Sequence, residues 1–274
     1  MVEGVEPVID EAPASANQTM DAIADEAARD HAPLRRVFLQ YVTPEGVRSG
    51  SKLADLVRTG DSLALRLYLI AVLKASSSPW DTALPAAVWA RALGHPSPTS
   101  KGATGAISKA WRRLDEHKLI RRGRYNRMAQ ITLLREDGSG TGYTHPGDKD
   151  TRTDSVDGYF KVPDALWRLG PKPGERWVRE LTIPELAMLL ISLSLNDGFR
   201  LPIEDAPSWY GVSADTAQRG LAGLRSRGIL EVDTRTKTAP LSPTGTTTEH
   251  RYTLQPPFGP IGRQQKSRRR GANR

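Results

Sequence analysis

The stretch GVSADTAQRGLAGLRSRGIL, residues 211–230, decides the fold. Ser213 is a favourable N-cap and Gly228 a favourable helix end, so a helix is predicted between them. Three apolar residues recur at helical spacing and give this helix one face to bury: Ala217, Leu221 and Leu224. The opposite face is polar and basic, so the helix is predicted to pack on other helices while presenting charged side chains to a partner.

The string resembles the recognition helix of winged helix-turn-helix transcription factors of the GntR and MarR types. Their pattern is S-x-x-T-x-x-R-x-L-x-x-L-x-x-x-G-h-h, where h is apolar. It is filled by Ser213, Thr216, Arg219, Leu221, Leu224, Gly228, Ile229 and Leu230. The resemblance implies helices followed by a β-hairpin, the wing, and sequence-specific binding of double-stranded DNA. The alternative is an amphipathic surface helix of an unrelated fold, because such helices often end in glycine.

The flanking segments stand in the order that this fold needs. Residues 182–185 form a T-x-x-E capping box, followed by an apolar helix through Leu195 and a short helix over residues 202–210. After Gly228 the hydrophobic period changes from about 3.6 to about 2, which predicts a β-hairpin. Its tip is expected over residues 234–248 and carries Arg235 and Lys237.

A second copy of this order lies in the first half of the chain. A shift of 110 residues lays residues 103–120 on residues 213–230, and Trp111 and Leu114 then fall on two leucines of the apolar face. Helices are expected upstream over residues 63–75 and 85–93. A basic hairpin is expected from residues 119–122 and 128–134, with its tip at residues 123–126.

The first copy departs from the pattern at three places. Ala106 stands where the threonine belongs, and Lys118 where the helix-ending glycine belongs. About seven extra residues, 95–101, precede its helix. The helix start and the base-reading positions of the first copy can therefore differ in register from those of the second copy. Trp111 is expected in the core, because it takes the place of a buried leucine.

The polar helix faces and the hairpins supply the predicted DNA contacts. In winged-helix proteins the N-terminal half of the recognition helix reads bases, while later basic residues and the wing contact phosphates. Gln218 is expected to pair with adenine and Arg219 with guanine. The alternative for the first hairpin is a solvated charged surface. The predicted contacts are Lys101, Thr104, Ser108, Lys109, Arg112, Arg113, Arg121, Arg122, Arg124, Tyr125, Asn126 and Arg127 in the first copy, and Ser213, Asp215, Thr216, Gln218, Arg219, Arg225, Arg235 and Lys237 in the second.

Composition agrees with a polyanionic partner. The 274 residues carry a net charge of +8, and the isoelectric point is about 9.8. The absence of cysteine excludes disulfides and cysteine-ligated zinc, and the five histidines are scattered. Residues 138–142 are glycine-rich but lack the lysine of a phosphate-binding loop. We therefore expect no enzyme activity, no catalytic residue, no cofactor and no metal.

The expected fold is mainly α with small β-hairpins, of the α+β class, with two tandem winged helix-turn-helix domains. A strand over residues 159–162 is expected to open the second domain, with residues 38–42 as its counterpart in the first. No apolar run is long enough for a membrane span, and the acidic N-terminus is unlike a secretory signal, so a cytoplasmic, nucleoid-associated location is expected. The expected parts are an acidic disordered tail with a short helix near residues 20–28 (1–32), the first domain (33–136), a linker (137–157), the second domain (158–257) and a basic disordered tail (258–274).

Three functions remain open at this stage. The first is a transcriptional regulator that reads two unlike half-sites, arranged asymmetrically or as a direct repeat. The second is a replication initiator of a plasmid or other mobile element, whose layout of tandem winged helices without an effector domain is similar. The third is a nucleoid or adaptor-type structural protein. Homodimerisation is a further hypothesis, as is competition of the acidic tail with DNA or its binding to a protein partner.

Overall fold

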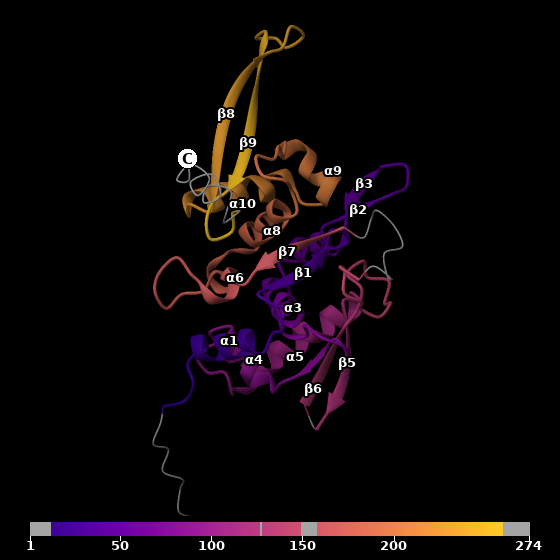
Figure 1. Cartoon of the computed structure of the whole chain (residues 1–274), viewed down its shortest axis with the longest axis vertical. Helices are drawn as coiled ribbons and strands as arrows, with labels where there is room; N and C mark the ends of the chain where they lie inside the picture. The colour runs from indigo at the N-terminus through magenta and orange to yellow at the C-terminus, as the bar shows by residue number, and fades with distance from the viewer. Residues whose placement is uncertain (1–11, 127, 149–157, 260–274) are drawn as a thin grey trace, which may run out of the picture.

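Two halves of the chain repeat one order of elements in the computed structural model, which describes residues 12–126, 128–148 and 158–259 (Figure 1). In the first half, three helices precede a hairpin: α3 (Ser62–Lys74), α4 (Ala86–Ala92), α5 (Lys101–Glu116), β5 (Ile120–Tyr125) and β6 (Met128–Leu133). The second half repeats them as α8 (Ile183–Leu193), α9 (Ala206–Tyr210), α10 (Ala214–Ser226), β8 (Leu230–Thr238) and β9 (Thr246–Leu254). The α+β class is confirmed.

The helix ends follow the local signals of the sequence. The capping box at Thr182 forms with Glu185 and starts α8, and Ser213 caps α10 by accepting a hydrogen bond from the Thr216 N–H. Helix α10 buries the predicted apolar face and ends at Ser226, and Gly228, the predicted helix-ending glycine, follows two residues later with a φ of +71°. Lys118 takes the same place after α5 and has a φ of +55°, so it adopts the left-handed conformation without being glycine.

Each hairpin pairs with a short segment that lies between the first two helices of its half. Strand β4 (Asp81–Ala83) joins the first hairpin in the order β4-β6-β5, with Thr82 opposite Ile131. In the second half Phe199 forms an isolated antiparallel bridge with Tyr252. Ile131 and Tyr252 hold matching positions in their hairpins. Ile131 lies two residues before Leu133, which pairs with the first residue of β5, and Tyr252 lies two residues before Leu254, which pairs with the first residue of β8. Thr82 and Phe199 are therefore equivalent.

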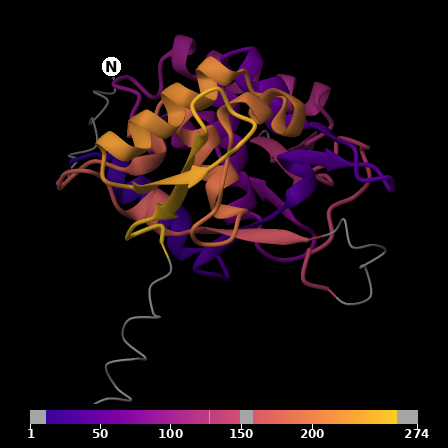
Figure 2. The same ribbon diagram turned by 90° about the horizontal axis from the view of Figure 1, so that it is seen from above.

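The halves are joined by strands that precede each repeat. β1 (His31–Arg35) pairs antiparallel with β7 (Tyr159–Pro163), and Pro33 faces Lys161 at the centre of the register. The pair lies between the halves, and the two hairpins extend toward opposite ends of the molecule (Figure 1). Viewed down the long axis, hairpin β8–β9 lies in front of the helices (Figure 2). The predicted strand at residues 159–162 is confirmed.

The predicted counterpart at residues 38–42 is wrong. Arg36–Phe38 is a 3₁₀ turn, and β2 (Gln40–Val42) pairs with β3 (Arg48–Gly50) in a separate hairpin. The partner of β7 is β1, which begins in the segment predicted as tail (1–32) and continues into the predicted first domain. The apolar residues of 38–42 suggested a strand, but Phe38 and Leu39 are both buried in the core.

Contacts between the halves are reciprocal. The segment between β1 and α3 includes α2 (Lys52–Arg58) and packs on α9, where Gly50 meets Gly211. The segment between β7 and α8 includes α6 (Ala165–Arg168) and α7 (Trp177–Glu180), and Arg179 of α7 packs on Gly94, which follows α4 as Gly211 follows α9. Reciprocal contacts of this kind, with the symmetric register of β1 and β7, describe an approximate two-fold axis within one chain.

The prediction of a disordered tail through residue 32 is wrong for residues 16–32, and the short helix expected within it near residues 20–28 is present at residues 16–25. Helix α1 (Ala16–Asp25) begins with a capping box at Ser15 and Gln18 and buries Met20 and Ile23. Its acidic residues form ion pairs with the second half: Asp21 with Arg176 and Asp25 with Arg168. The acidic composition therefore serves contacts inside the fold here. Residues 1–11 lie outside the described residues, as do residues 260–274 of the predicted basic tail.

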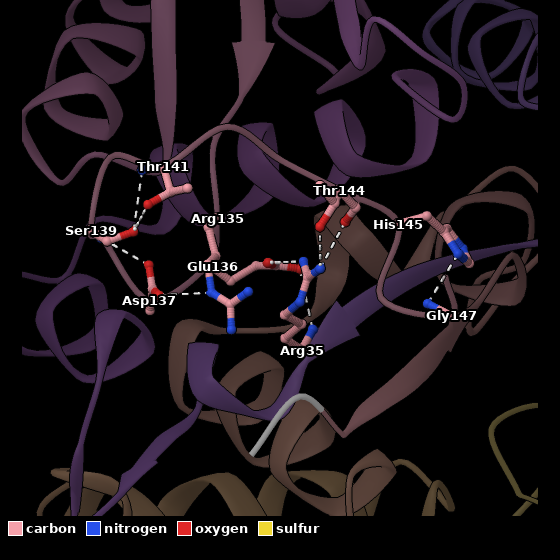
Figure 3. A network of polar contacts seen from close by, with 9 residues as sticks. All are labelled: Arg35, Arg135, Glu136, Asp137, Ser139, Thr141, Thr144, His145 and Gly147. Carbon is pink, nitrogen blue, oxygen red and sulfur yellow. Dashed lines mark hydrogen bonds and ion pairs between the residues drawn. The ribbon is translucent and has the colours of Figure 1, made fainter. Parts of the chain in front are cut away.

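The first part of the predicted linker also belongs to the core. Arg35 and Glu136 are both buried and form an ion pair with 2.8 Å between Nη1 and Oε2 (Figure 3). Arg35 also donates from Nη2 to the carbonyl and hydroxyl oxygens of Thr144, each at 2.9 Å. Burial raises the pKa of Glu136 against the opposing effect of Arg35. Tyr143 is buried beside this pair, so residues 136–144 are fixed against β1.

One continuous cluster of buried residues runs through both halves, which explains why the halves form a single body. The cluster includes Trp111, as predicted. The Trp111 ring packs edge to face on the Trp89 ring, with 5.3 Å between the ring centroids. None of the helices in the described part of the chain has the length and apolar character that crossing a lipid bilayer requires.

Candidate nucleic-acid interface

Helix α5 presents a basic stripe to solvent. Lys101, Ser108, Lys109 and Arg112 are exposed, while Thr104 is half-buried. The hydroxyls of Thr104 and Ser108 donate to the helix carbonyls of Ser100 and Thr104, so only their oxygen lone pairs remain to accept from a partner. The helix starts at Lys101 after the N-cap Ser100, about one turn earlier than the shift of 110 residues implies.

Arg113 does not belong to that stripe. Its guanidinium binds the carboxylate of Asp61, the N-cap of α3, with 2.8 Å between Nη2 and Oδ1. Burial opposes ionisation of Asp61, but the hydrogen bonds from Arg113 and from the Ala64 N–H outweigh it and hold the Asp61 pKa below its ordinary value. Arg113 therefore fixes α5 to α3. Its side chain remains 40% exposed, and its assignment as a DNA contact stays a prediction.

The first hairpin is exposed along its basic strand. Arg121, Arg124, Tyr125 and Asn126 all lie in solvent, and Tyr125 is 56% exposed. Asn126 forms the turn with a φ of +45°, a conformation that asparagine tolerates better than most residues. Arg122 reaches back to Asp115 of α5, with 3.2 Å between Nε and Oδ2. Arg127 lies outside the described residues.

The start of α10 uses two predicted contact residues for its own structure. The hydroxyl of Ser213 donates to that of Thr216 at 2.8 Å, besides capping the helix. Asp215 pairs with Arg219 one turn later, with 2.9 Å between the carboxylate and the guanidinium. This pair orients Arg219 along the exposed face, on which Gln218 and Arg225 also lie.

The second hairpin is longer than predicted, and its tip is shorter. Strands β8 and β9 extend to Thr238 and Thr246, so only residues 239–245 form the tip and the expected span of 234–248 is wrong. The threonine-rich composition suggested a loop, but β-branched residues favour strands. Arg235 and Lys237 consequently lie on β8. Arg235 pairs with Asp233 at 2.8 Å.

A cationic cluster on this hairpin surrounds one buried carboxylate. Glu249 contacts Lys237, Arg200 at 3.1 Å and Arg251 at 2.9 Å. Arg200 and Arg251 are exposed enough to reach a phosphate, and neither was predicted. The strand period of β9 places Arg251 two residues after Glu249 on the same face, so a correct strand boundary would have identified it. Arg200 comes close only through tertiary packing.

Among the described residues, no three histidine, aspartate or glutamate side chains come together in a group that could hold a metal ion. No family model, curated protein or solved structure matches the chain. The candidate interface therefore rests on the helices α5 and α10 and the two hairpins themselves.

Proposed function

We propose that this chain is a sequence-specific double-stranded DNA-binding protein that regulates transcription through two tandem winged helix-turn-helix units. The observation that carries the proposal is the repeated order of three helices and a hairpin, in which the third helix is capped, amphipathic and exposed on its polar side. A helix of this kind fits the major groove, and a hairpin beside it can reach the neighbouring backbone.

The two units divide the contacts by chemistry. In the second unit, Gln218 and Arg219 have the donors and acceptors that read adenine and guanine edges, and Asp215 holds Arg219 in place. In the first unit, Lys109 and Arg112 on α5 and the arginines of β5 are suited to phosphates. We propose that the first unit contributes mainly affinity and the second mainly sequence preference.

The approximate two-fold axis changes the expected target. Two half-sites read by units related by a two-fold axis run in opposite directions, so the site is an imperfect inverted repeat and not a direct repeat. Because the exposed residues of α5 and α10 differ, the half-sites differ in sequence. A single chain is then sufficient to occupy one site.

The test is genome-wide mapping of bound DNA in the native host, followed by gel shifts on recovered sites. A Gln218→Ala, Arg219→Ala variant is expected to lose at least tenfold in affinity for those sites, while binding unrelated DNA almost as the wild type does. Lys172→Ala is the matched control, since it removes one exposed positive charge in the loop after α6.

The distribution of sites separates the remaining functions. Sites at promoters, lost in the variant, support a regulator. One cluster of repeated sites beside an AT-rich tract supports a replication initiator instead. Diffuse binding that is the same for the variant and the wild type supports a nucleoid-type structural protein and contradicts base reading by α10.

A further inference from the structure

A cavity of about 290 Å³ lies at the base of the second hairpin. Its walls are mostly apolar and come from the end of α8, the loop after it, β9 and the segment beyond, and they include Leu195, Phe199, Leu254 and Phe258. The volume is at the lower end of what small-molecule sites use. Two phenylalanine rings on its walls favour a flat apolar occupant.

One wall carries a buried polar atom without a partner. The side chain of Ser192 is almost fully buried, and among the described residues its hydroxyl finds no hydrogen-bond partner. A serine in a helix can donate to the carbonyl one turn earlier, as Ser194 nearby donates to Ile191. A buried hydroxyl left unpaired is unfavourable, but this oxygen has almost no accessible surface and is therefore not exposed to the cavity.

The first half of the chain has an aromatic residue at the equivalent position of its sequence. Trp80 lies two residues before Thr82, and Asp197 lies two residues before Phe199, so the two positions correspond. The Trp80 ring packs edge to face on Tyr143, with 5.3 Å between ring centroids. The second half has the small, exposed Asp197 there, and Asp197 and Phe258 both line the cavity.

No part of the chain outside the described residues can provide an aromatic ring for the cavity. Every Phe, Trp and Tyr of the sequence lies in the described residues, and residues 1–11, 127, 149–157 and 260–274 contain none. We infer that the cavity binds a small aromatic molecule of one or two rings. Such a ligand would brace Leu254 and hence the base of hairpin β8–β9. The inference goes beyond the proposed function, and its test needs no DNA.

The probe is indole, titrated into the full chain with ¹³C-labelled leucine methyl groups. Saturable shifts are expected at Leu195 and Leu254. Asp197→Trp introduces the aromatic residue of the first half at the cavity wall and is expected to abolish them, while Asp197→Asn, which keeps the side chain small, binds as the wild type does. Ser192→Ala is expected to leave the affinity for indole unchanged, because the Ser192 hydroxyl is not exposed to the cavity.

Three outcomes would overturn the inference. The first is a folded wild type that gives no saturable shift up to the solubility limit of indole. The second is a folded Asp197→Trp variant that binds indole as well as Asp197→Asn does. The third is a concentration-dependent dimer of the free protein that Asp197→Trp abolishes, since the occupant would then be a second copy. If Asp197→Trp does not fold, Leu195→Phe narrows the cavity from another wall, and the same loss is expected.

Discussion

Gly50 and Gly211 touch backbone to backbone across the two halves: a Cβ atom on Gly50 would lie 2.7 Å from the Cα of Gly211. Gly50→Ala is therefore expected to force β3 away from the end of α9 and to lower the free energy of unfolding by about 1–3 kcal/mol. Urea denaturation monitored by circular dichroism measures the change.

Gly105→Ala is the matched control, because it adds the same methyl group within α5, where nothing lies within 4 Å of the new Cβ. It is expected to stabilise the protein by about 0.5–1 kcal/mol, the difference between glycine and alanine inside a helix. Equal stability of the Gly50→Ala variant and the wild type would contradict the close contact.

Lys118→Gly is expected to stabilise the protein by about 1 kcal/mol. Lys118 holds a left-handed conformation that disfavours residues with a Cβ, and glycine removes that strain at the end of α5. Gly228→Ala, the reverse exchange at the equivalent position after α10, is expected to destabilise by a similar amount. Thermal unfolding of both variants tests this, and opposite signs are required.

Acid is expected to weaken the contact between α3 and α5. The pKa of Asp61 is lower in the folded protein than its ordinary value of 3.8, so its contribution to stability is complete above that value and is lost as the pH falls through the folded-state pKa. Asp61→Asn should be less stable than the wild type at pH 7 and should lose less stability between about pH 5 and pH 2. Parallel pH curves for the two proteins would show that Asp61 does not contribute.

Glu249→Gln is expected to strengthen binding to DNA of unrelated sequence at low salt. The carboxylate neutralises part of the charge of Arg200, Lys237 and Arg251, and its removal frees cationic charge for phosphates. The slope of log affinity against log salt should steepen by up to about one. Glu231→Gln changes the charge equally at the base of the same hairpin, beside Gln255, and should have a smaller effect.

The repeated helices and hairpins were predictable because their signals are local. The capping residues Ser213 and Thr182, the apolar spacing in α10 and the change of period after Gly228 each fix an element within a few residues. What the sequence missed depends on distant partners. The acidic composition of residues 16–30 suggested a disordered tail with a short helix, whereas the packing of that helix on the fold depends on arginines more than 100 positions away, such as Arg176.

The candidate interface was predictable in the same measure. Exposure followed from helical and strand periodicity for most of the predicted contacts, including Lys109 and Gln218. The ion pair of Arg113 was not predictable, because Asp61, which binds it, is 52 residues away. Arg200 was missed for the same reason, since its neighbour Glu249 comes close only when the loop after α8 packs on β9.

Because the approximate two-fold axis lies inside one chain, the equivalent contacts between the two halves need not have the same residues. In a symmetric dimer of identical subunits, any substitution appears twice and must suit both places. Here Gly211 meets bare backbone at Gly50, whereas its equivalent, Gly94, meets the side chain of Arg179. A substitution on one side therefore leaves the equivalent contact on the other side unchanged, and the two halves can differ in sequence independently of each other.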